Sequence, residues 1–316
     1  MVYLIDIGSD IGGLQATLQQ VYDAMIVHCS ELIGISSSLA GFGALWYIGE
    51  HVWLKIADAQ PVDLKPLYRP FVIGMAIFLF PSVIALINGV MQPTVTGTAA
   101  IVNDSNQAVA TLLQQKEDAL KNSTDWQMYN GPEGSGDLSK WEALSGQADS
   151  GMFSGISNRV KFEMAKMSYN FKNSMKVGLS EILQIVFEAA ALCINTVRTF
   201  YLIILGILGP LAFGLSVYKG FESTLTNWLA RYINVFLWLP VANIFGSLIA
   251  QIQQQMIKLD IAQLSATGQT TFGPTDTAYL IFLLMAIVGY FTVPSVTNYI
   301  VQAGGLGARV WRSKIN

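Results

Sequence analysis

One stretch in the C-terminal half of the chain restricts the fold more than any other. Between Tyr232 and Ile257 there is no charged side chain, and the stretch begins within the segment WLARYINVFLWLP, residues 228–240. A helix on the surface of a soluble protein carries polar residues along one face every three or four positions. A run of this length without charge is instead typical of a helix that crosses a bilayer, which needs about 20 mostly apolar residues.

The composition of the whole chain agrees with a membrane protein. Of 316 residues, 52% are hydrophobic and 12% are charged, and the mean hydropathy is +0.45, whereas soluble domains carry about 25% charged residues. We therefore predict an all-α, polytopic membrane protein with about five transmembrane helices and additional external amphipathic helices. The net charge of −3 neither favours nor excludes a nucleic-acid partner.

Five uncharged segments have a length close to that of a transmembrane helix. A sixth apolar segment, 182–197, contains Glu188 and is followed by Arg198, and charges inside a bilayer disfavour a separate span that faces lipid. The five predicted spans are residues 32–49, 71–91, 199–218, 232–250 and 277–302.

Basic residues predict how these spans are oriented, because short cytoplasmic loops are enriched in Lys and Arg. Loops 50–70 and 219–231 and the tail after 302 hold eight of these residues, whereas residues 1–31 and loop 251–276 hold one. We therefore expect a periplasmic N-terminus and a cytoplasmic C-terminus.

The same rule assigns residues to the cytoplasmic edge of the membrane. Arg231 marks the inner end of the fourth span, and Trp228 beside it has the amphipathic ring that is common at membrane interfaces. Trp238 lies deeper, where we expect it to pack against another helix. The predicted cytoplasmic-side anchors are Arg69, Lys219, Trp228, Arg231, Arg309 and Arg312.

The long segment 92–181 lies outside by this orientation. It begins with an amphipathic helical pattern, and the Gly- and Ser-rich stretch 123–157 predicts a flexible loop around a short helical turn. The chain therefore divides into 1–91, with the periplasmic N-terminus and two spans, the external segment 92–181, and 182–316, with three spans and a basic tail.

A basic amphipathic helix is predicted at 158–176. Val160, Met164, Met167 and Phe171 follow one another at intervals of four, three and four residues, and lysines occupy other faces. We expect this helix to extend outwards from the third span. The alternative is that it lies on the outer surface of the membrane.

Ionisable residues near a span are candidates for function. Glu181 and Glu188 are seven residues apart and share a helix face, which could line a conduit or face another subunit. The alternative is that both carboxylates are solvated outside the bilayer, with Arg198 at the membrane interface.

Helix breakers and small residues mark further positions inside the spans. The first span presents Gly34, Ser38, Gly41 and Ala44, a face suited to close helix packing within a subunit or between copies. Proline removes a backbone donor and kinks a helix. The predicted bends are at Pro81, Pro210, Pro240 and Pro294.

The sequence lacks the patterns of an enzyme. It has no H-E-x-x-H, no paired-cysteine zinc spacing, no G-x-S-x-G, and no glycine loop that ends in G-K-[ST]. We therefore expect no catalytic residues, no bound metal and no cofactor.

Long stretches of the chain resemble one family. They include FPSVIALINGVMQP, GFESTLTNWLARYINVFLWLPVANIFGSLIAQIQ and TDTAYLIFLLMAIVGYFTVPSVTNYIVQAGG. These are similar to the TraJ proteins of conjugative transposons, within the broader TrbL-like group of type IV secretion subunits. The resemblance covers residues 21–305 and is weakest at 123–157.

The resemblance implies a subunit of the bacterial inner membrane in a conjugation apparatus. It implies a homo-oligomer beneath the periplasmic stalk, with inner-membrane scaffold subunits, separate secretion ATPases and the lipid bilayer as partners. The transferred substrate would be single-stranded DNA with its attached relaxase. A secondary transporter or channel is the alternative, but it should show repeated halves and a site at the midplane, and we find neither in the sequence.

The predicted orientation can be tested by cysteine labelling. In a Cys29→Ser, Cys193→Ser background, a cysteine that replaces Ser135 should react with an impermeant maleimide in intact spheroplasts, because residues 92–181 are expected outside. Labelling that requires lysis would reverse the orientation.

Overall fold

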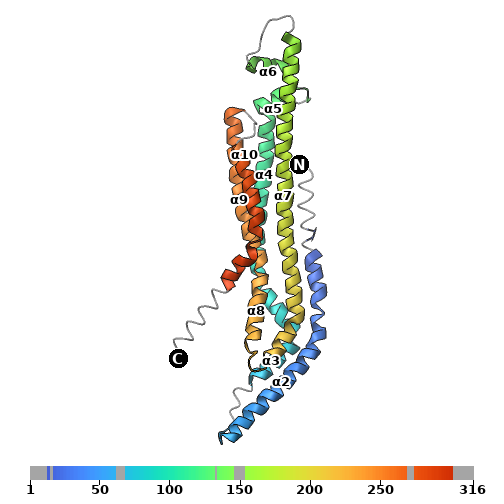
Figure 1. Ribbon diagram of the computed structural model, residues 1–316, viewed down its shortest axis with the longest axis vertical. Coiled ribbons are helices and arrows are strands. Elements are labelled where there is room, and N and C mark those ends of the chain that lie inside the picture. The colour runs from blue at the N-terminus through green and yellow to red at the C-terminus, as the bar shows by residue number, and fades with distance from the viewer. Residues whose placement is uncertain are drawn as a thin grey trace, which may run out of the picture. The chain divides into compact units, whose positions relative to one another are not determined.

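The described part of the chain is helical throughout, apart from short turns and loops. The computed structural model describes residues 13–14, 17–61, 68–131, 134–145, 154–268 and 274–301. Within these ranges there is no strand (Figure 1). The prediction of an all-α protein is confirmed.

The helices follow the predicted order of spans and external segments. Their bounds are α2 Cys29–Ala57, α3 Tyr68–Phe78, α4 Phe80–Lys121, α5 Thr124–Tyr129, α6 Leu138–Ser145, α7 Ser154–Leu215, α8 Ser223–Phe236, α9 Trp238–Thr267 and α10 Pro274–Tyr290. The short turn predicted near residue 140 is α6.

Among the described residues, three helices are long and apolar enough to cross a membrane. They are Thr17–Ala57, Ile156–Leu215 and Ser223–Ala266. Two bent pairs, Tyr68–Phe78 with Phe80–Lys121 and Thr277–Tyr290 with Val293–Val301, raise the number to five if each pair is one span. Each of the five predicted spans overlaps one of these helices or pairs, although the third, 199–218, continues past Leu215 and residue 302 of the fifth lies outside the described residues.

The longest helix decides between two interpretations of the sequence. α7 runs for 62 residues without interruption, so the amphipathic stretch 158–176 and the apolar stretch 182–197 belong to one helix with the predicted third span. The expected extension of the third span is confirmed, and 182–197 is not a separate helix.

Contacts divide the chain into two compact units. Unit 1 contains Met1–Ala99, Ala191–Ala242 and Tyr290–Asn316, and unit 2 contains Ala100–Ala190 and Asn243–Gly289. This division rests on packing. The predicted division into 1–91, 92–181 and 182–316 concerns the sides of a membrane and stays a prediction.

Aromatic side chains form the centre of unit 1. Phe80 at the start of α4 is fully buried and contacts Phe213 of α7 and Trp228 of α8, with ring centroids 5.3 and 5.7 Å apart. Trp228 also stacks on Tyr232 at 5.4 Å. These rings join three helices, so they position the helices that carry the polar groups described below.

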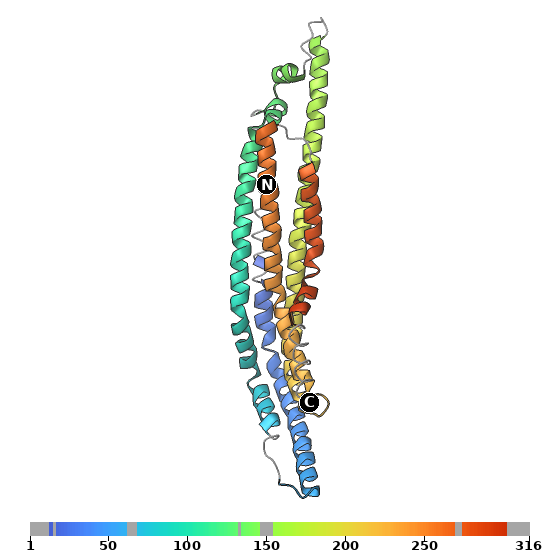
Figure 2. The same ribbon diagram turned by 90° about the vertical axis from the view of Figure 1, so that its left-hand side faces the viewer.

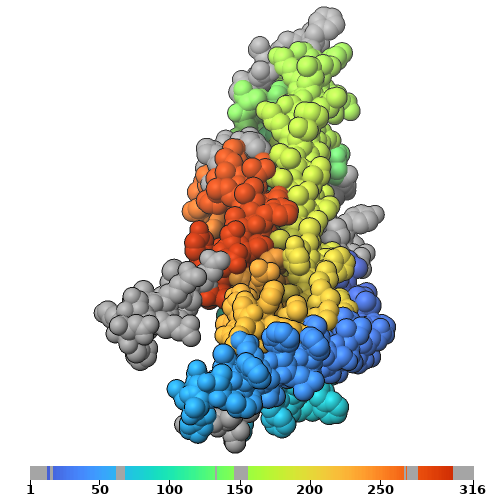
Figure 3. Space-filling model, turned by 60° about the horizontal axis from the view of Figure 1, so that its bottom comes forward, coloured from blue at the N-terminus to red at the C-terminus, as the bar shows by residue number. Residues whose placement is uncertain are grey.

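Small residues allow α2 to approach α7 closely in unit 1. A Cβ on Gly214 would lie 3.0 Å from the backbone oxygen of Ser36, and a Cβ on Gly43 would lie 2.9 Å from the ring of Tyr218. Figure 3 shows the side chains of α2 over the C-terminal part of α7. The side chains of α2 that are buried by this packing belong to Cys29, Ser36 and Ala40, beside Gly43.

Three of the four predicted proline bends lie just after a break between helices. Pro81 and Pro294 follow bends of 82° and 51°, and Pro240 is the third residue of α9, directly after the break at Leu237. Proline is tolerated in the first turn of a helix, where its missing N–H has no helical partner. Pro210 instead lies inside α7, which continues past it.

In unit 2, parts of four helices run alongside one another (Figure 2). Ser105 of α4 shares a hydrogen bond of 3.0 Å with Ser247 of α9, and Gln253 of α9 donates to Gln184 of α7 at 3.4 Å. Gly289 of α10 faces the ring of Phe245, since a Cβ there would lie 2.0 Å from it. Polar contacts thus supplement apolar packing in this unit.

The short helices α5 and α6 pack on the N-terminal part of α7. Met128, Trp141 and Phe162 form a buried cluster, and the Tyr129 ring stacks on Tyr169 at 4.8 Å. Asp137 caps α6: its carboxylate accepts hydrogen bonds from the Ser139 hydroxyl and the Lys140 amide, which lower its pKa. The region predicted as a flexible loop therefore contains a small packed cap, although residues 132–133 and 146–153 lie outside the described residues.

The aromatic centre of unit 1 leads to a stability prediction. Gly209→Ala places a Cβ 2.1 Å from the Phe80 ring, which is held by Phe213 and Trp228 and has little room to move. Overpacking of this kind costs about 1–3 kcal/mol, so the midpoint of thermal unfolding in detergent should fall.

Gly34→Ala is the matched control, because no atom lies within 4 Å of a Cβ at that position. It should leave the midpoint unchanged or raise it, since Ala is the better helix former. Equal effects of the two changes would contradict the described packing around Phe80.

Candidate functional site

A closed ring of hydrogen bonds lies inside unit 1. The hydroxyl groups of Tyr22 and Tyr232 are 2.8 Å apart, and the side-chain amide of Asn88 bonds to both of them at 2.9 Å. Both tyrosines are buried. The three residues come from the helix Thr17–Ala57, α4 and α8, so the ring ties three helices together and satisfies its own polar groups.

A buried arginine is the most unusual feature of unit 1. The side chain of Arg198 in α7 is 8% exposed, and its guanidinium lies 5.1 Å from the centre of the Phe236 ring. Its Nε donates to the carbonyl oxygen of Phe236 at 3.3 Å, and a second nitrogen donates to Asn195 at 3.5 Å. Within the described residues no carboxylate pairs with Arg198.

The backbone around Pro240 explains why Arg198 donates a hydrogen bond to the Phe236 carbonyl oxygen. In an α-helix the carbonyl of residue 236 accepts from the N–H of residue 240. That residue is Pro240, which has no N–H, and an unsatisfied carbonyl inside an apolar region is costly. Arg198 supplies the missing donor. Its side chain is buried in protein, and its position at the membrane interface stays a prediction.

A second polar cluster lies in unit 2 and includes one of the candidate conduit residues. The Gln184 side chain donates to Glu188 at 3.1 Å, and Gln253 of α9 donates to Gln184. The other carboxylate oxygen of Glu188 is buried and has no hydrogen-bond partner. Gln184 therefore links Glu188 to α9, while Glu181 on the same face of α7 is half-buried. A conduit role for this pair stays a prediction.

An ion pair between distant parts of the sequence also holds unit 2 together. The ammonium of Lys116 in α4 bonds to the carboxylate of Asp260 in α9, and their side chains are 22% and 12% exposed. Nothing in the spacing of two residues so far apart in the chain indicates their contact. A pair of this kind orients helices more than it stabilises them, because desolvation offsets the attraction.

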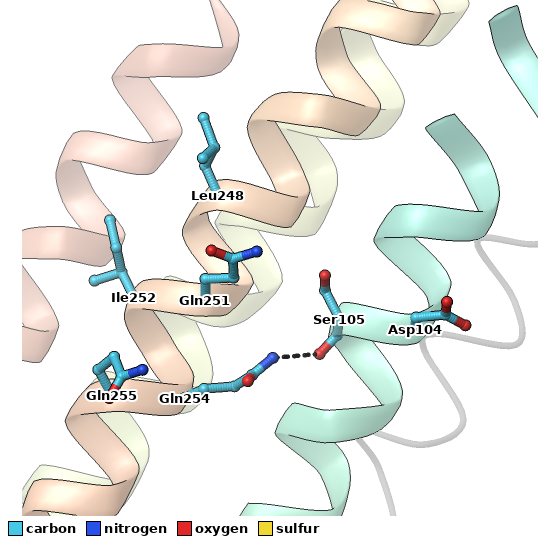
Figure 4. Close-up of a pocket in the computed structure, with 7 residues that line it drawn as sticks. All are labelled: Asp104, Ser105, Leu248, Gln251, Ile252, Gln254 and Gln255. Atoms are coloured by element: carbon cyan, nitrogen blue, oxygen red, sulfur yellow. Dashed lines mark hydrogen bonds between the residues drawn. The ribbon is translucent and has the colours of Figure 1, made fainter. Parts of the chain in front are cut away.

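The face between α4 and α9 contains a polar groove of about 680 Å³ (Figure 4). The Gln254 side chain reaches across it and donates to the backbone oxygen of Ser105 at 3.1 Å. The residues that line it are Asp104, Ser105, Leu248, Gln251, Ile252, Gln254 and Gln255. This set holds one carboxylate, one hydroxyl and three side-chain amides, so it is suited to hydrogen bonding.

Two predicted membrane anchors form ion pairs in unit 1. Arg69 contacts Glu222 at 2.7 Å and donates to the backbone oxygen of Ser216 at 3.1 Å. Lys219 contacts Glu50 at 2.6 Å. These exposed pairs link the end of α2 and the start of α3 to the connection between α7 and α8.

The other anchors are placed differently. Arg231 is exposed on α8, whereas Trp228 is 5% exposed and donates its indole N–H to the backbone oxygen of Leu205 at 2.9 Å. Trp228 therefore packs inside the protein, and its depth in the membrane stays a prediction. Trp238 packs edge-on against Tyr201 of α7 at 5.6 Å, as expected. Arg309 and Arg312 lie outside the described residues.

The predicted small-residue face of α2 is not the face that packs within the chain. Gly34, Ser38 and Gly41 are exposed, and Ala44 is half-buried. The neighbouring face with Ser36, Ala40 and Gly43 packs against α7 instead. Small residues occur on both faces, so their spacing could not decide between them.

Across the described ranges, no group of three or more His, Cys, Asp or Glu side chains could hold a metal ion. A comparison with protein families gives a positive result. The family model described as homologues of TraJ from Bacteroides conjugative transposon matches residues 9–316. The chain belongs to this TraJ family. A search of curated proteins finds no match.

Membership in the TraJ family connects the chain with the transfer of conjugative transposons. The match extends over both units and over the helices suited to cross a membrane, so the resemblance seen in the sequence is confirmed. Within this TraJ-family chain, the polar clusters described above link helices to one another.

The role of Arg198 can be tested by a double-mutant cycle. Arg198→Met leaves the Phe236 carbonyl without a donor, which costs about 1–3 kcal/mol of stability. Pro240→Ala restores a backbone N–H at residue 240, so in that background the cost of Arg198→Met should be smaller by about 1 kcal/mol. Thermal unfolding in detergent measures both values.

Arg231→Met is the matched control, because Arg231 is an exposed arginine on α8; its effect should stay within about 0.5 kcal/mol. If Arg198→Met costs the same whether or not the Pro240→Ala change is present, the arginine does not replace the missing donor.

Proposed function

We propose that this TraJ-family chain is a multi-pass inner-membrane subunit of a conjugative type IV secretion system. In this role, copies of the chain form an oligomeric platform on which the periplasmic stalk assembles. The observation that carries the proposal is the family match over residues 9–316, in a chain whose helices are suited to cross a membrane.

The polar groups of the described helices support a structural role. Tyr22, Asn88 and Tyr232 bond to one another, and Arg198 bonds to a backbone carbonyl. Groups that are occupied in this way hold helices in place and are not available to attack a substrate. The energy for transfer would therefore come from separate ATPases of the secretion system, with this chain as their partner in the membrane.

The proposal also includes a contribution of this chain to the path of the transferred DNA. Single-stranded DNA with an attached relaxase would pass along an oligomer of this chain. The described helices offer candidate lining residues in Glu181 and Glu188, but the lysines of the external segment are balanced by acids such as Asp104, Glu117 and Asp118 and make no clear phosphate-binding stripe. Support for the platform is therefore stronger than support for a DNA-binding surface.

The proposed orientation places the N-terminus in the periplasm and the C-terminus in the cytoplasm. Arg69 and Lys219, both in loops assigned to the cytoplasmic side, lie in unit 1 and pair with Glu222 and Glu50. Both ion pairs involve the connection between α7 and α8, which is consistent with a location of Arg69 and Lys219 on the same side of the membrane.

The proposal predicts that loss of this chain blocks conjugation at the transfer step, after the element has been excised and its DNA nicked. In-frame deletion of the gene should reduce transfer of the element to recipients below detection, because the DNA cannot cross the inner membrane. Excision of the element and nicking of its DNA occur before that step and should continue at normal levels. Mating frequency and quantitative PCR of the excised form measure the two effects.

A plasmid copy of the intact gene should restore transfer, which excludes effects on neighbouring genes. Transfer at normal frequency without this chain would overturn the proposal. Loss of excision together with transfer would place the chain at an earlier step.

A further inference from the structure

The outer part of α7 has one face that is already packed. Asn158, Phe162 and Tyr169 are buried, and they face the cap formed by α5 and α6 through Trp141, Tyr129 and Glu142. Lys166 adds bonds of 2.9 Å to the backbone oxygens of Gly134 and Ser135. This face therefore has its partners within unit 2.

The opposite face of the same helix segment carries large apolar side chains that no part of unit 2 covers. Their exposed fractions lie between 56% and 71%. At about 100° per residue they fall on one side of the helix, roughly 180° from Phe162 and Tyr169. We call this surface the α7 stripe: Ile156, Val160, Met164, Met167, Phe171 and Met175.

A bilayer does not account for this stripe. The predicted third span begins at residue 199, and a helix rises about 1.5 Å per residue. Met175, the nearest member, would therefore precede the span by roughly 36 Å of helix, which exceeds the whole thickness of a hydrocarbon core of about 30 Å. A continuous apolar surface of this kind in water marks a protein interface.

The spacing within the stripe fits a second helix of the same direction. From Ile156 to Met175 the intervals are four, four, three, four and four residues, which follows the repeat of about 11 residues, about 3.7 per turn, that lets helices pack along a right-handed seam. Copies of one membrane protein insert with the same topology, so their α7 helices run parallel. A neighbouring copy thus presents the same stripe in the same direction.

The charges beside the stripe favour a second copy as the partner. Lys161 and Lys172 lie along one edge, and Glu163 and Glu181 lie along the other, because residues two positions apart on a helix point about 200° away from each other. Arg159 lies one turn before Glu163 and farther from the stripe. When two parallel helices of this kind lie side by side, the basic edge of one meets the acidic edge of the next. Lys161 and Glu163 differ in height by only about 3 Å.

We propose that the α7 stripe is the seam through which neighbouring copies of this chain pack, parallel and in register, with the basic edge of one copy against the acidic edge of the next. The proposal deepens the proposed function, since it rests on the oligomeric platform and assigns its contact outside the membrane. Six side chains at on the order of 100 Å² each supply roughly 600 Å² per copy, close to the roughly 800 Å² per partner of stable interfaces.

Site-specific cross-linking in membranes tests the seam. In a Cys29→Ser, Cys193→Ser background, Met167→Cys and Phe171→Cys should each form a disulfide-linked dimer of the chain after mild oxidation, because parallel helices in register bring identical stripe positions together. Arg159→Cys is the control: it is exposed on the same helix but lies on another face, and should give no dimer.

Exchanging the charges tests the edges. Lys161→Glu and Glu163→Lys should each lower the yield of the Met167→Cys dimer by roughly two- to fivefold. The double exchange should restore it, because the acidic and basic edges then simply trade places. Cross-linking to a partner other than a second copy would not be restored by the double exchange, since the charges of that partner stay unchanged.

These experiments can overturn the seam without overturning the proposed function. A disulfide to a different protein of the secretion system, identified by mass spectrometry, or the absence of any stripe dimer in cells that still transfer DNA would overturn the seam and leave the proposed function standing. Equal dimer yields at 159, 167 and 171 would also overturn it, because random collisions do not distinguish the faces of a helix.

Discussion

The backbone of a chain in lipid must satisfy its own hydrogen bonds, and the rest of this structure depends on that constraint. Helices meet it within a single segment, which explains why the described residues form helices joined by short turns and loops. Pro240 breaks the rule at one point, because it leaves the Phe236 carbonyl without its helical donor. Arg198 restores the bond from another helix. A charged side chain is thus buried in an apolar unit because it completes the backbone.

The same constraint determines what the polar side chains inside the helices do. Tyr22, Asn88 and Tyr232 bond in a ring, and Gln184 bridges Glu188 and Gln253. Such bonds specify how the helices pack against one another.

Features that depend on local sequence could be predicted, and features that depend on distant contacts could not. The absence of charge over about 20 residues at a time identified all five candidate spans, and the 4-3-4 spacing after Val160 identified the outer part of α7 as a helix. In contrast, the burial of Trp228 and the packing of Ser36 rather than Ser38 depend on which helix lies opposite. The donor role of Arg198 depends on a proline 42 positions later in the chain.

We propose that this TraJ-family chain works as a membrane subunit of a larger transfer machine. The most direct test is mild-detergent purification of a tagged copy from cells that carry the native operon, with chemical cross-linking and mass spectrometry of all proteins recovered. We expect to recover other copies of the chain together with secretion ATPases, stalk proteins and inner-membrane scaffold proteins. Recovery of the chain alone, as one species even after cross-linking, would be incompatible with a role as a machine subunit and would favour a self-contained transporter.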